Sequence, residues 1–530
     1  METTNLSKIR REKMLNTINE IKKNITDESV LNNLSLIENE LTKKKYGLIW
    51  EEHEERVDKE LVTQIPTFEE AKGKQVKTCD SKFNFLLEGD NLHSLYLLEK
   101  THRERIDVIY IDPPYNTGKE FIYNDDLVDN IDEYRHSKWL SFMKRRLSTV
   151  KLLLKQTGVI FLSIDDNEFA QLKILCDEIF GEENNISNFA VIRAEGGGLA
   201  KQVIKGHDYA LAYAKNINCF RPLAKEKDIR GKKINRGGIE YWIQEDWLRK
   251  EFGKYGNCHY EEIVKYKGEK VKTEIDEGLK TGKYILLPKN NGMNIVGKLR
   301  RLDEDSSKFY SVLKHLNRNG VNELKKFDLP IPFDYPKPVS LIKELVKGAT
   351  FFTKNQNPII LDFFAGSGTT GQAVLELNNE DGGNRSFILC TNNDNGICEE
   401  ITYNRLKQCI IGNKNIEALH GNLKYYKTSY VPRINTDEEN LSKNLMVNIK
   451  NLIQLENGIE IDDKIVRVIL TEEDIDKFTT NEKELNECEK LYISSDILLT
   501  SKQNKIFNDY NIELFIIPEY YFEDEIREVA

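Results

Sequence analysis

The chain has 530 residues, of which 39% are hydrophobic and 31% charged, and its formal net charge is −10. This length exceeds one ordinary hydrophobic core and predicts roughly three or four domains. No apolar run approaches the ~20 residues that a membrane span needs, and the amino terminus lacks the apolar core of a signal peptide. The eight cysteines form no C-x-x-C pair, so we expect a reduced, cytoplasmic protein without a metal site or a disulfide framework.

The charge is unevenly distributed along the chain. Residues 431–530 carry a net charge of −12, which leaves +2 on the remainder, and residues 201–330 alone carry +10. A basic central segment beside an acidic carboxyl-terminal segment is typical of a protein that contacts nucleic acid through its middle only. The alternative explanation is an ordinary solvated charge run.

Residues 1–75 form a predicted helical amino-terminal region. Apolar residues recur there at helical spacing, first at Ile9, Met14, Ile18, Ile21 and Ile25 and then at Leu31, Leu34, Ile37 and Leu41. Nothing in this region resembles a catalytic motif. Packing or dimerisation is therefore its expected role.

From residue 76 the pattern changes to short apolar runs that alternate with helical stretches. The runs 83–88, 106–111 and 159–164 each lead into acidic residues, and a helical pattern over 134–154 separates the last two. Buried strands that alternate with helices predict an open, mostly parallel, Rossmann-like α/β sheet. Ligands of such sheets bind at the carboxyl ends of the strands.

The central residues 215–325 lose this rhythm and predict an inserted domain. They are polar, lysine-rich and punctuated by glycines, and residues 221–236 hold seven basic and two acidic side chains. The basic residues that we expect to contact nucleic acid are Lys225, Lys227, Arg230, Lys232, Lys233 and Arg236.

The α/β rhythm returns with predicted strands at 358–362 and 386–390, separated by a glycine-rich turn and a helix from about residue 372. Residues 76–214 and 326–430 would then form one α/β domain around the insert. Residues 431–530 follow as an acidic segment that also has an α/β pattern.

The glycine-rich turn is a candidate cofactor loop. The sequence from Gly366 to Gly371 matches G-x-G-x-x-G directly after a predicted strand and at the start of a helix. Such a match arises by chance about 0.2 times in a chain of this length, so alone it indicates a tight turn or a nucleotide-type cofactor. Asp394, about 20 residues farther on, is suited to ribose hydroxyls. A nicotinamide cofactor of an oxidoreductase fits this segment as well as a methyl donor does.

The tetrapeptide Asp112-Pro113-Pro114-Tyr115 separates these alternatives. It ends the strand predicted at 106–111 and would arise by chance about 0.002 times in such a chain. The two prolines fix the backbone and remove two N–H donors, which concentrates hydrogen-bond acceptors at this point. The alternative explanation is a rigid turn with a solvated Asp and Tyr.

An amino group conjugated to a base ring is a poor nucleophile, because its lone pair is delocalised. The Asp112 carboxylate and the Pro113 carbonyl would each accept one amino hydrogen and turn the lone pair toward a methyl sulfonium, while Tyr115 would stack on the base. No covalent intermediate or metal is needed, since positioning and electrostatics supply most of the rate. The target base must leave a duplex to reach such a site.

The order of these motifs resembles a known class of enzymes. DPPYNTG at 112–118, followed far downstream by LDFFAGSGTT at 361–370, resembles the β-class amino-methyltransferases of DNA, whose target-recognition domain lies between the two motifs. Further strings resemble the modification subunits of type III restriction-modification systems, namely EGDNLHSLYLL, IYIDPPYNTGKEFIYND, SIDDNE, HDYALAYAKN, PFDYPKPVSLI and KYGLIWEEHEE.

The resemblance implies a mostly parallel, seven-stranded methyltransferase domain with a target-recognition domain at 215–325. It implies S-adenosylmethionine as the cofactor and N6 of adenine in double-stranded DNA as the target, with N4 of cytosine as the alternative. A homodimer is implied, with residues 431–530 serving dimer or restriction-subunit contacts. The chain has no G-x-x-x-x-G-K-[ST] loop, so the ATP-dependent helicase-nuclease would be a separate subunit. A solitary methyltransferase and a DNA-binding module without catalysis are the alternatives.

The resemblance also assigns roles to individual residues. The catalytic and base-holding residues would be Asp112, Pro113, Pro114 and Tyr115. The cofactor-binding residues would be Asp90, Lys337, Asp362, Phe364, Ala365, Gly366, Ser367, Gly368, Thr369, Thr370 and Asp394. Asn393 is the alternative to Asp394, and His207 and Tyr209 would border the base pocket or form an aromatic framework.

Overall fold

The structure is a computed structural model. It describes residues 6–42, 50–118, 122–123, 126–127, 132–195, 202–229, 231–251, 256–302, 304–333, 335–432, 438–517 and 521. Among the described helices, none combines the length and the apolar character that crossing a lipid bilayer requires.

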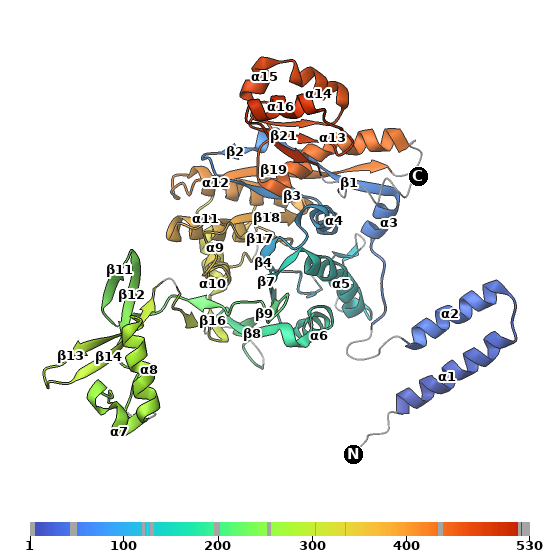
Figure 1. The fold of residues 1–530 in the computed structure, drawn as a ribbon. Helices are drawn as coiled ribbons and strands as arrows, with labels where there is room; N and C mark the ends of the chain where they lie inside the picture. Colours follow the sequence, from blue (N-terminus) through green and yellow to red (C-terminus); the bar gives the residue numbers. More distant parts are fainter. Residues whose placement is uncertain are drawn as a thin grey trace.

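A large mixed sheet of eleven strands forms the centre of the molecule (Figure 1). Its strands are β1 Gln64–Glu70, β2 Val76–Lys77, β3 Phe83–Glu88, β4 Ile106–Ile111, β7 Leu154–Ile164, β8 Asn185–Ile192, β9 His207–Ala214, β16 Val312–Lys314, β17 Ile359–Asp362, β18 Ser386–Thr391 and β19 Asn422–Pro432. They lie in the order β1-β19-β3-β18-β17-β4-β7-β9-β8-β16, and β2 pairs with β19.

The middle of this sheet is parallel, as the sequence predicts. The six neighbours from β19 to β7 all run in one direction, and β9 is antiparallel to β7. The expected count of seven strands describes this centre only. It was too low for the whole sheet because β1 and β2 extend one edge and β8 and β16 extend the other.

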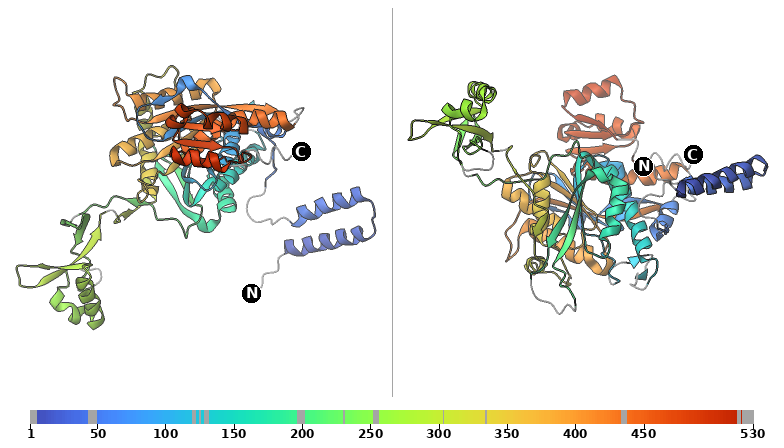
Figure 2. Two further views of the ribbon diagram at one scale, coloured as in Figure 1. Left: turned by 45° about the horizontal axis from the view of Figure 1, so that its top comes forward. Right: turned by 90° about the horizontal axis from the view of Figure 1, so that it is seen from below.

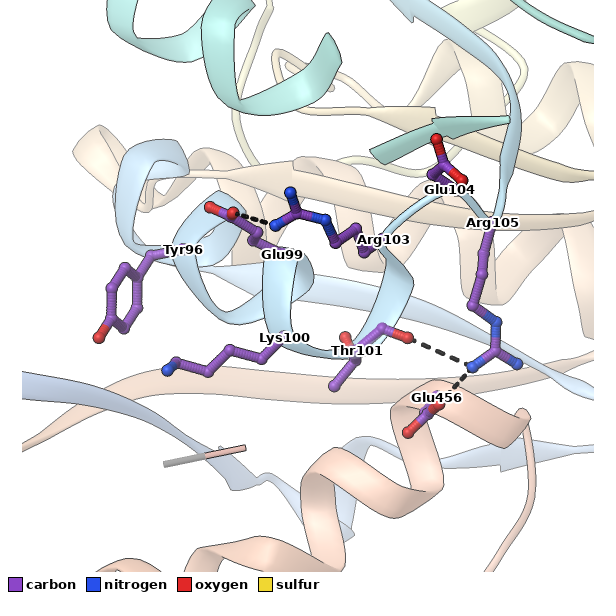
Figure 3. A pocket seen from close by; sticks show the side chains of 8 residues that line it. All are labelled: Tyr96, Glu99, Lys100, Thr101, Arg103, Glu104, Arg105 and Glu456. Carbon is purple, nitrogen blue, oxygen red and sulfur yellow. Dashed lines mark hydrogen bonds and ion pairs between the residues drawn. The ribbon is translucent and has the colours of Figure 1, made fainter. Parts of the chain in front are cut away.

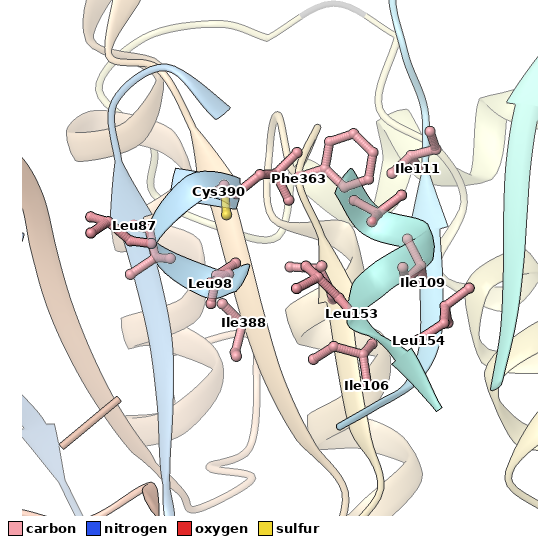
Figure 4. Close-up of a cluster of buried hydrophobic side chains, with 14 of the residues drawn as sticks. Leu87, Leu98, Ile106, Ile109, Ile111, Leu153, Leu154, Phe363, Ile388 and Cys390 are labelled. Carbon is pink, nitrogen blue, oxygen red and sulfur yellow. The ribbon is translucent and has the colours of Figure 1, made fainter. Parts of the chain in front are cut away.

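Helices cover both faces of the sheet. The helices α4 Asn91–His102, α5 Arg135–Leu153, α6 Phe169–Phe180 and α13 Glu438–Asn457 contribute to the core on one face, and α10 Val339–Ala349, α11 Thr369–Asp381 and α12 Asn404–Ile411 to the core on the other. Strand residues alternate between the two cores. In β4, Ile109 and Ile111 join the first core (Figure 4), whereas Val108 and Tyr110 join the second. The apolar runs of the sequence reflect this burial on both faces.

The connections of the sheet define one topological switch point at its carboxyl edge. The neighbours β4 and β17 continue in opposite directions, since β4 leads through α5 to β7 and β17 leads through α11 to β18. These crossover helices pack on opposite faces. In open α/β sheets, ligands bind at the carboxyl ends of the strands where the direction reverses in this way.

The insert forms a separate unit that projects from the main sheet (Figures 1 and 2). It contains a four-stranded antiparallel sheet and its own small core. Its elements are β11 Lys233–Arg236, β12 Ile239–Gln244, α7 Ile263–Lys267, α8 Glu269–Lys280, β13 Tyr284–Pro288 and β14 Asn294–Arg301. A short ladder of β10 Ala224–Lys225 with β15 Ser307–Lys308 connects it to the body.

The carboxyl-terminal boundary of this insert differs from the prediction. Residues 312–314 form β16, which pairs with β8 in the main sheet, and α9 Asn317–Leu324 follows it. The expected boundary at 325 therefore includes main-sheet residues. The three residues of β16 are too few to give a strand pattern in the sequence.

Of the described residues in the amino-terminal region, 6–23, 28–42 and 56–63 form α-helices, and 72–74 form a short 3-10 helix. Helices α1 Leu6–Lys23 and α2 Glu28–Thr42 form a projecting hairpin (Figure 2), and α3 Arg56–Thr63 leads directly into β1. The predicted helical region at 1–75 therefore also contains a strand, at 64–70. Ile65 and Phe68 are fully buried there, and β1 pairs with β19 along its whole length.

The chain ends in a small three-stranded parallel sheet with its own apolar core. Its elements are β20 Val466–Ile469, α14 Glu472–Thr479, α15 Glu482–Glu487, β21 Lys490–Ile493, α16 Ser501–Asp509 and β22 Glu513–Ile516. Helix α13 precedes this unit and packs on the main sheet instead, through residues such as Leu452 and Ile453.

Candidate active site

Asp112 and Tyr115 follow the carboxyl end of β4, at the point where the strand order reverses. The Tyr115 hydroxyl donates a hydrogen bond of 2.9 Å to Asp112 Oδ1. Lys337 Nζ lies 3.2 Å from the same oxygen and 4.7 Å from the centre of the Tyr115 ring, and it also donates to the Tyr115 hydroxyl. Burial, and secondarily the charge of Asp112, raise the pKa of Tyr115 well above its usual value. Asp112 and Tyr115 therefore form one cluster with Lys337, which the resemblance associates with the cofactor.

The two prolines between them have different surroundings. Pro113 is buried and Pro114 half-buried. The Pro114 carbonyl accepts a 2.7 Å hydrogen bond from Trp139 Nε1, and Trp139 is fully buried in α5. The framework thus holds the second proline in place. The Pro113 carbonyl is the acceptor that the sequence predicts for an amino hydrogen of the base.

Asp362 ends β17 and stabilises the turn that follows it. Its Oδ1 accepts the Phe364 N–H at 3.0 Å, and its Oδ2 accepts the Thr370 hydroxyl at 2.5 Å. The side chain is only 2% exposed, and this burial raises the pKa of Asp362 to about 7. Asp362 therefore stabilises the loop through internal hydrogen bonds, and its side chain is not exposed to a ligand.

The glycines of the loop allow a tight turn and close packing of the helix that follows it. Gly366 and Gly368 have φ values of +47° and +78°, which glycine adopts without strain. A Cβ atom on Gly368 would lie 3.0 Å from the Thr402 side chain, and one on Gly371 would lie 2.4 Å from Leu406. Tight turning and close helix packing thus require these glycines, and the loop presents bare backbone at the carboxyl edge. This geometry fits a nucleotide-type cofactor.

The other predicted loop residues divide into two groups. Phe364 is half-buried and packs its ring 5.8 Å from that of Phe142. In contrast, the remaining side chains are at most 6% exposed and support the loop from inside. These residues are Ala365, Ser367, Thr369 and Thr370.

Arg405 is a supporting residue that the sequence analysis missed. It is fully buried in α12. Its Nη1 donates to the hydroxyls of Ser367 at 2.9 Å and Thr369 at 2.8 Å, and its Nε donates to Gln372 at 2.8 Å. One side chain thus holds two residues of the glycine-rich loop and the residue that follows it. An arginine 34 positions beyond Gly371 carries no local signal of this role.

Asp90 caps a helix at the same edge. Its carboxylate accepts the Leu92 N–H at 2.7 Å at the start of α4 and lies 3.4 Å from Arg146. Arg146 is fully buried, pairs with Glu55 at 2.8 Å and donates to Asn91 at 2.5 Å. Asn91 in turn donates to the Phe363 carbonyl at 2.9 Å. This network joins the G-D-N string to the cofactor loop, and no local pattern pointed to Arg146.

Asp394 and Asn393 follow β18. Asn393 Oδ1 accepts the Glu399 N–H at 3.1 Å and so supports the π-helix at Ile397–Tyr403. Asp394 is exposed and accepts from Asn392 at 2.5 Å. The Asn393 side chain is thus engaged within the fold, whereas the Asp394 carboxylate is exposed. The geometry therefore favours Asp394 as the residue available to ribose hydroxyls.

The start of β9 contributes aromatic and acidic side chains. Tyr209 stacks on Phe169 with 4.0 Å between ring centres, and His207 meets Tyr209 edge-on at 5.1 Å. These contacts match the aromatic-framework alternative. Between them, Asp208 is buried and pairs with Arg193 at 3.1 Å. Its pKa is raised chiefly by burial, and the sequence analysis did not identify it.

The basic residues predicted to contact nucleic acid have different environments. Lys225 pairs with Glu344, and Lys227 lies 3.2 Å from Asp305 and over the Trp242 ring. These two lysines therefore hold the root of the insert to neighbouring elements. Lys232, Lys233 and Arg236 are exposed on or beside β11. Arg230 lies outside the described residues.

A cavity of about 550 Å³ lies away from these residues (Figure 3). It is situated where α4 ends and before β4 begins, at the opposite end of β4 from Asp112, so we do not assign the chemistry to it. Its lining residues are Tyr96, Glu99, Lys100, Thr101, Arg103, Glu104, Arg105 and Glu456.

Residues 106–403 match a family of known proteins described as DNA methylase (N6_N4_Mtase). The StyLTI Mod subunit of Salmonella typhimurium, a type III restriction-modification enzyme, is 31% identical over 61% of this chain and 55% of its own length. The EcoPI Mod subunit of Escherichia phage P1 is 30% identical over 68% of this chain and 66% of its own length. The match thus spans about half to two thirds of these type III relatives.

A type II relative is covered more fully. The methyltransferase M.KpnI of Klebsiella pneumoniae is 34% identical over 60% of this chain and 83% of its own length. Among solved structures, a DNA modification methylase of Thermus thermophilus in complex with S-adenosyl-L-methionine is 14% identical with a TM-score of 0.32, covering 64% of this chain and 99% of that one. The PvuII cytosine-N4-specific DNA methyltransferase is 12% identical with a TM-score of 0.34. The match covers 72% of this chain and 95% of that one.

The matched span includes both Asp112–Tyr115 and the glycine loop, in the order that the resemblance predicts. The resemblance to type III modification subunits is likewise confirmed by the relatives. The nicotinamide alternative for the glycine loop has no such support. The family match at 106–403 covers more than half of this chain, and the chain therefore belongs to the DNA methylase family.

Proposed function

We propose that this protein transfers a methyl group from S-adenosylmethionine to N6 of an adenine flipped out of double-stranded DNA. We further propose that it acts in the cytoplasm as the modification and recognition subunit of a type III restriction-modification system. One observation carries the proposal: the Asp112–Tyr115 turn and the Asp362–Gly368 loop leave the carboxyl ends of the neighbouring parallel strands β4 and β17. Family membership and the type III relatives support it.

S-adenosylmethionine, when bound, supplies an electrophilic methyl group on a positively charged sulfur. The chain's own residues prepare the acceptor. Asp112 and the Pro113 carbonyl each accept an amino hydrogen of the base, so that the nitrogen lone pair faces the methyl group. Asp112 is also positioned to take the proton that the methylated nitrogen loses, and Tyr115 provides a flat face for the base.

Lys337 has a role on the base side in this scheme. Its ammonium group lies 3.2 Å from Asp112 and is only 11% exposed. It balances the carboxylate's charge while no base is present, and it orients the Tyr115 hydroxyl through their hydrogen bond. We assign the cofactor contacts instead to the Phe364–Gly366 backbone, with Asp394 at the ribose.

The DNA contacts are assigned to the insert, with one change from the sequence-based set. We retain the exposed Lys232, Lys233 and Arg236 of the hairpin β11–β12 and leave out Lys225 and Lys227, because internal ion pairs engage them. Basic side chains on a projecting hairpin are suited to phosphate contacts along a duplex.

The direct test is transfer of tritiated methyl groups from S-adenosylmethionine to mixed-sequence DNA. The modified DNA is digested to nucleosides and analysed by mass spectrometry, with N6-methyladenine as the expected product. N4-methylcytosine would show that the target base is wrong. Absence of label in DNA at every salt concentration, with folded protein, would overturn the function.

A solitary methyltransferase is the second candidate, and the fuller coverage of the type II enzyme M.KpnI favours it. The two candidates share their chemistry and differ in partners. The type III proposal expects an ATP-dependent helicase-nuclease subunit to co-purify with this chain from its natural source. Methylation without any such partner would favour the solitary enzyme.

A further inference from the structure

The residue that follows the catalytic motif is held by a buried carboxyl group. Asn116 is fully buried with φ +56°. Its Nδ2 donates to Glu168 Oε1 at 2.5 Å and to the Arg135 carbonyl at 3.2 Å. Arg135 begins α5, and Glu168 directly precedes α6. One amide thus fixes the end of the catalytic turn to the starts of two helices.

Glu168 is fully buried. Burial raises its pKa to about 8, although the Asn116 hydrogen bond and the charge of Arg135 lower it, and Asp165 adds to the rise. Its other close partner, His136 Nδ1, lies 2.7 Å from Oε1, and burial together with Arg135 lowers the pKa of His136. A neutral acid facing a neutral imidazole is therefore the state that this environment favours near pH 7.

Two further atoms mark this contact as sensitive to charge. Among the described residues, Glu168 Oε2 and Asn116 Oδ1 are buried without a hydrogen-bond partner. Ionisation of Glu168 would leave a buried oxygen with negative charge and no donor, which is costly. The turn that carries Tyr115 would then have to shift or admit water.

We propose that Glu168 and Asn116 form a brace that positions the Asp112–Tyr115 turn for methyl transfer. Asn116 can donate to Glu168 in either protonation state, but ionisation leaves an unsolvated charge on the buried Oε2. The water needed to solvate that charge would displace the turn. The inference rests on the proposed function and deepens it. Glu168 contacts neither the base nor the cofactor in this scheme, so it is a positioning residue.

The first test compares Glu168→Gln with Glu168→Ala. Glu168→Gln keeps an acceptor oxygen and cannot ionise, so we expect a kcat at pH 7 close to that of the wild type. The wild-type kcat should decline above pH about 8, whereas Glu168→Gln should lack this decline. Glu168→Ala should lower kcat by roughly 10- to 100-fold while KM for S-adenosylmethionine stays within about twofold, because only alignment is lost.

The second test exchanges donor and acceptor. Asn116→Asp alone places two carboxyl groups together and should lower kcat. The double variant N116D/E168Q restores the hydrogen bond with the new amide as donor, and it should recover most of the activity. Asn116→Gly is the matched control, since glycine keeps the positive φ and removes the side chain. It should behave like Glu168→Ala.

The outcomes distinguish failure of the brace proposal from failure of the proposed function. If the folded Glu168→Ala variant keeps its kcat within twofold, or if Glu168→Gln declines at the same pH as the wild type, the brace is overturned. If the wild type transfers no methyl group, the proposed function fails instead. Infrared difference spectra of wild type against Glu168→Gln then still report on the brace. A protonated-carboxyl band at pH 7 that is lost above pH about 8 supports it, and its absence at pH 7 contradicts it.

Discussion

Asp112 is the side chain whose loss should affect the chemistry most directly. Asp112→Ala removes an acceptor that develops its full interaction in the transition state, so we expect kcat to fall by at least about 100-fold. Affinity for DNA and for S-adenosylmethionine should remain within about threefold, since neither depends mainly on this carboxylate. Label transfer and fluorescence anisotropy measure the two effects.

The matched control for this variant is Glu99→Ala, which removes a half-buried carboxylate of α4 beside the cavity at the other end of the sheet. It should retain wild-type kcat. An Asp112→Ala enzyme that methylates DNA normally would mean that the active site lies elsewhere in the chain.

Asp362 should make the stability of the protein depend on pH. Its pKa is raised to about 7 in the folded state, so the native protein binds a proton more tightly than the unfolded chain does. The free energy of unfolding should therefore fall as pH rises from 5 to 8, by roughly 2–3 kcal/mol from this group. Asp362→Asn keeps an acceptor for the Phe364 N–H and should remove that contribution.

Urea unfolding of both proteins at pH 5 and pH 8 measures this effect. The informative quantity is how far the free energy of unfolding changes between pH 5 and pH 8 in the wild type compared with Asp362→Asn. All other groups titrate equally in both proteins, so their contributions cancel. An identical pH dependence in the two proteins would contradict the assignment of this proton to Asp362.

Single residues were predictable where the local sequence itself carries the chemistry. Asp112 and Tyr115 follow a strand, and Gly366 and Gly368 form a turn that few other residues could form. The residues that support them could not be found in this way. Arg405 and Glu168 act through partners 36 and 52 positions away, and only the fold brings such pairs together.

At the scale of elements, the exposed hairpin β11–β12 should supply phosphate contacts. Replacing Lys232, Lys233 and Arg236 by alanine should weaken DNA binding and reduce the slope of log affinity against log salt by up to roughly three, about 0.9 for each lost contact. Anisotropy titrations between low and moderate salt concentration measure this slope.

The contrasting variant replaces Lys225 and Lys227, whose ammonium groups pair with Glu344 and Asp305. Their loss should lower thermal stability and leave the salt slope unchanged. A reversed result, with the slope reduced only in this second variant, would show that the hairpin is not the DNA-contacting element.

Strands were predictable where both faces are buried. The predicted runs 83–88 and 106–111 coincide with β3 and β4, because a strand between two helical layers reads as a continuous apolar run. Edge strand β1 escaped prediction. Its sequence QIPTFEE mixes polar, proline and apolar residues, and its burial depends on β19, which lies more than 350 residues later in the chain.

At the scale of the whole molecule, charge is separated in space as well as in sequence. The basic insert and the acidic carboxyl-terminal unit lie well apart in every view (Figures 1 and 2). Screening at physiological salt, with a Debye length of about 8 Å, would weaken repulsion between DNA on the insert and the acidic unit. The net charge of −10 is thus compatible with a DNA substrate.

Self-association is the last property that we expect at this scale. The hairpin α1–α2 projects from the body (Figure 2) and exposes apolar side chains, among them Met14 at 52%, Leu36 at 64% and Ile37 at 51%. Exposed apolar surface of this kind marks an interaction site. We expect the purified chain to be a homodimer by light scattering and expect removal of residues 1–42 to shift it toward the monomer.

The truncated protein should keep its central sheet, because neither projecting helix contributes to the two cores beside the active site. Its circular dichroism spectrum and S-adenosylmethionine affinity should therefore stay near those of the full chain. If the full chain is a monomer, the homodimer is wrong. If the truncated chain remains a dimer, the contact lies on another surface, and the acidic unit of residues 431–530 becomes the next region to remove.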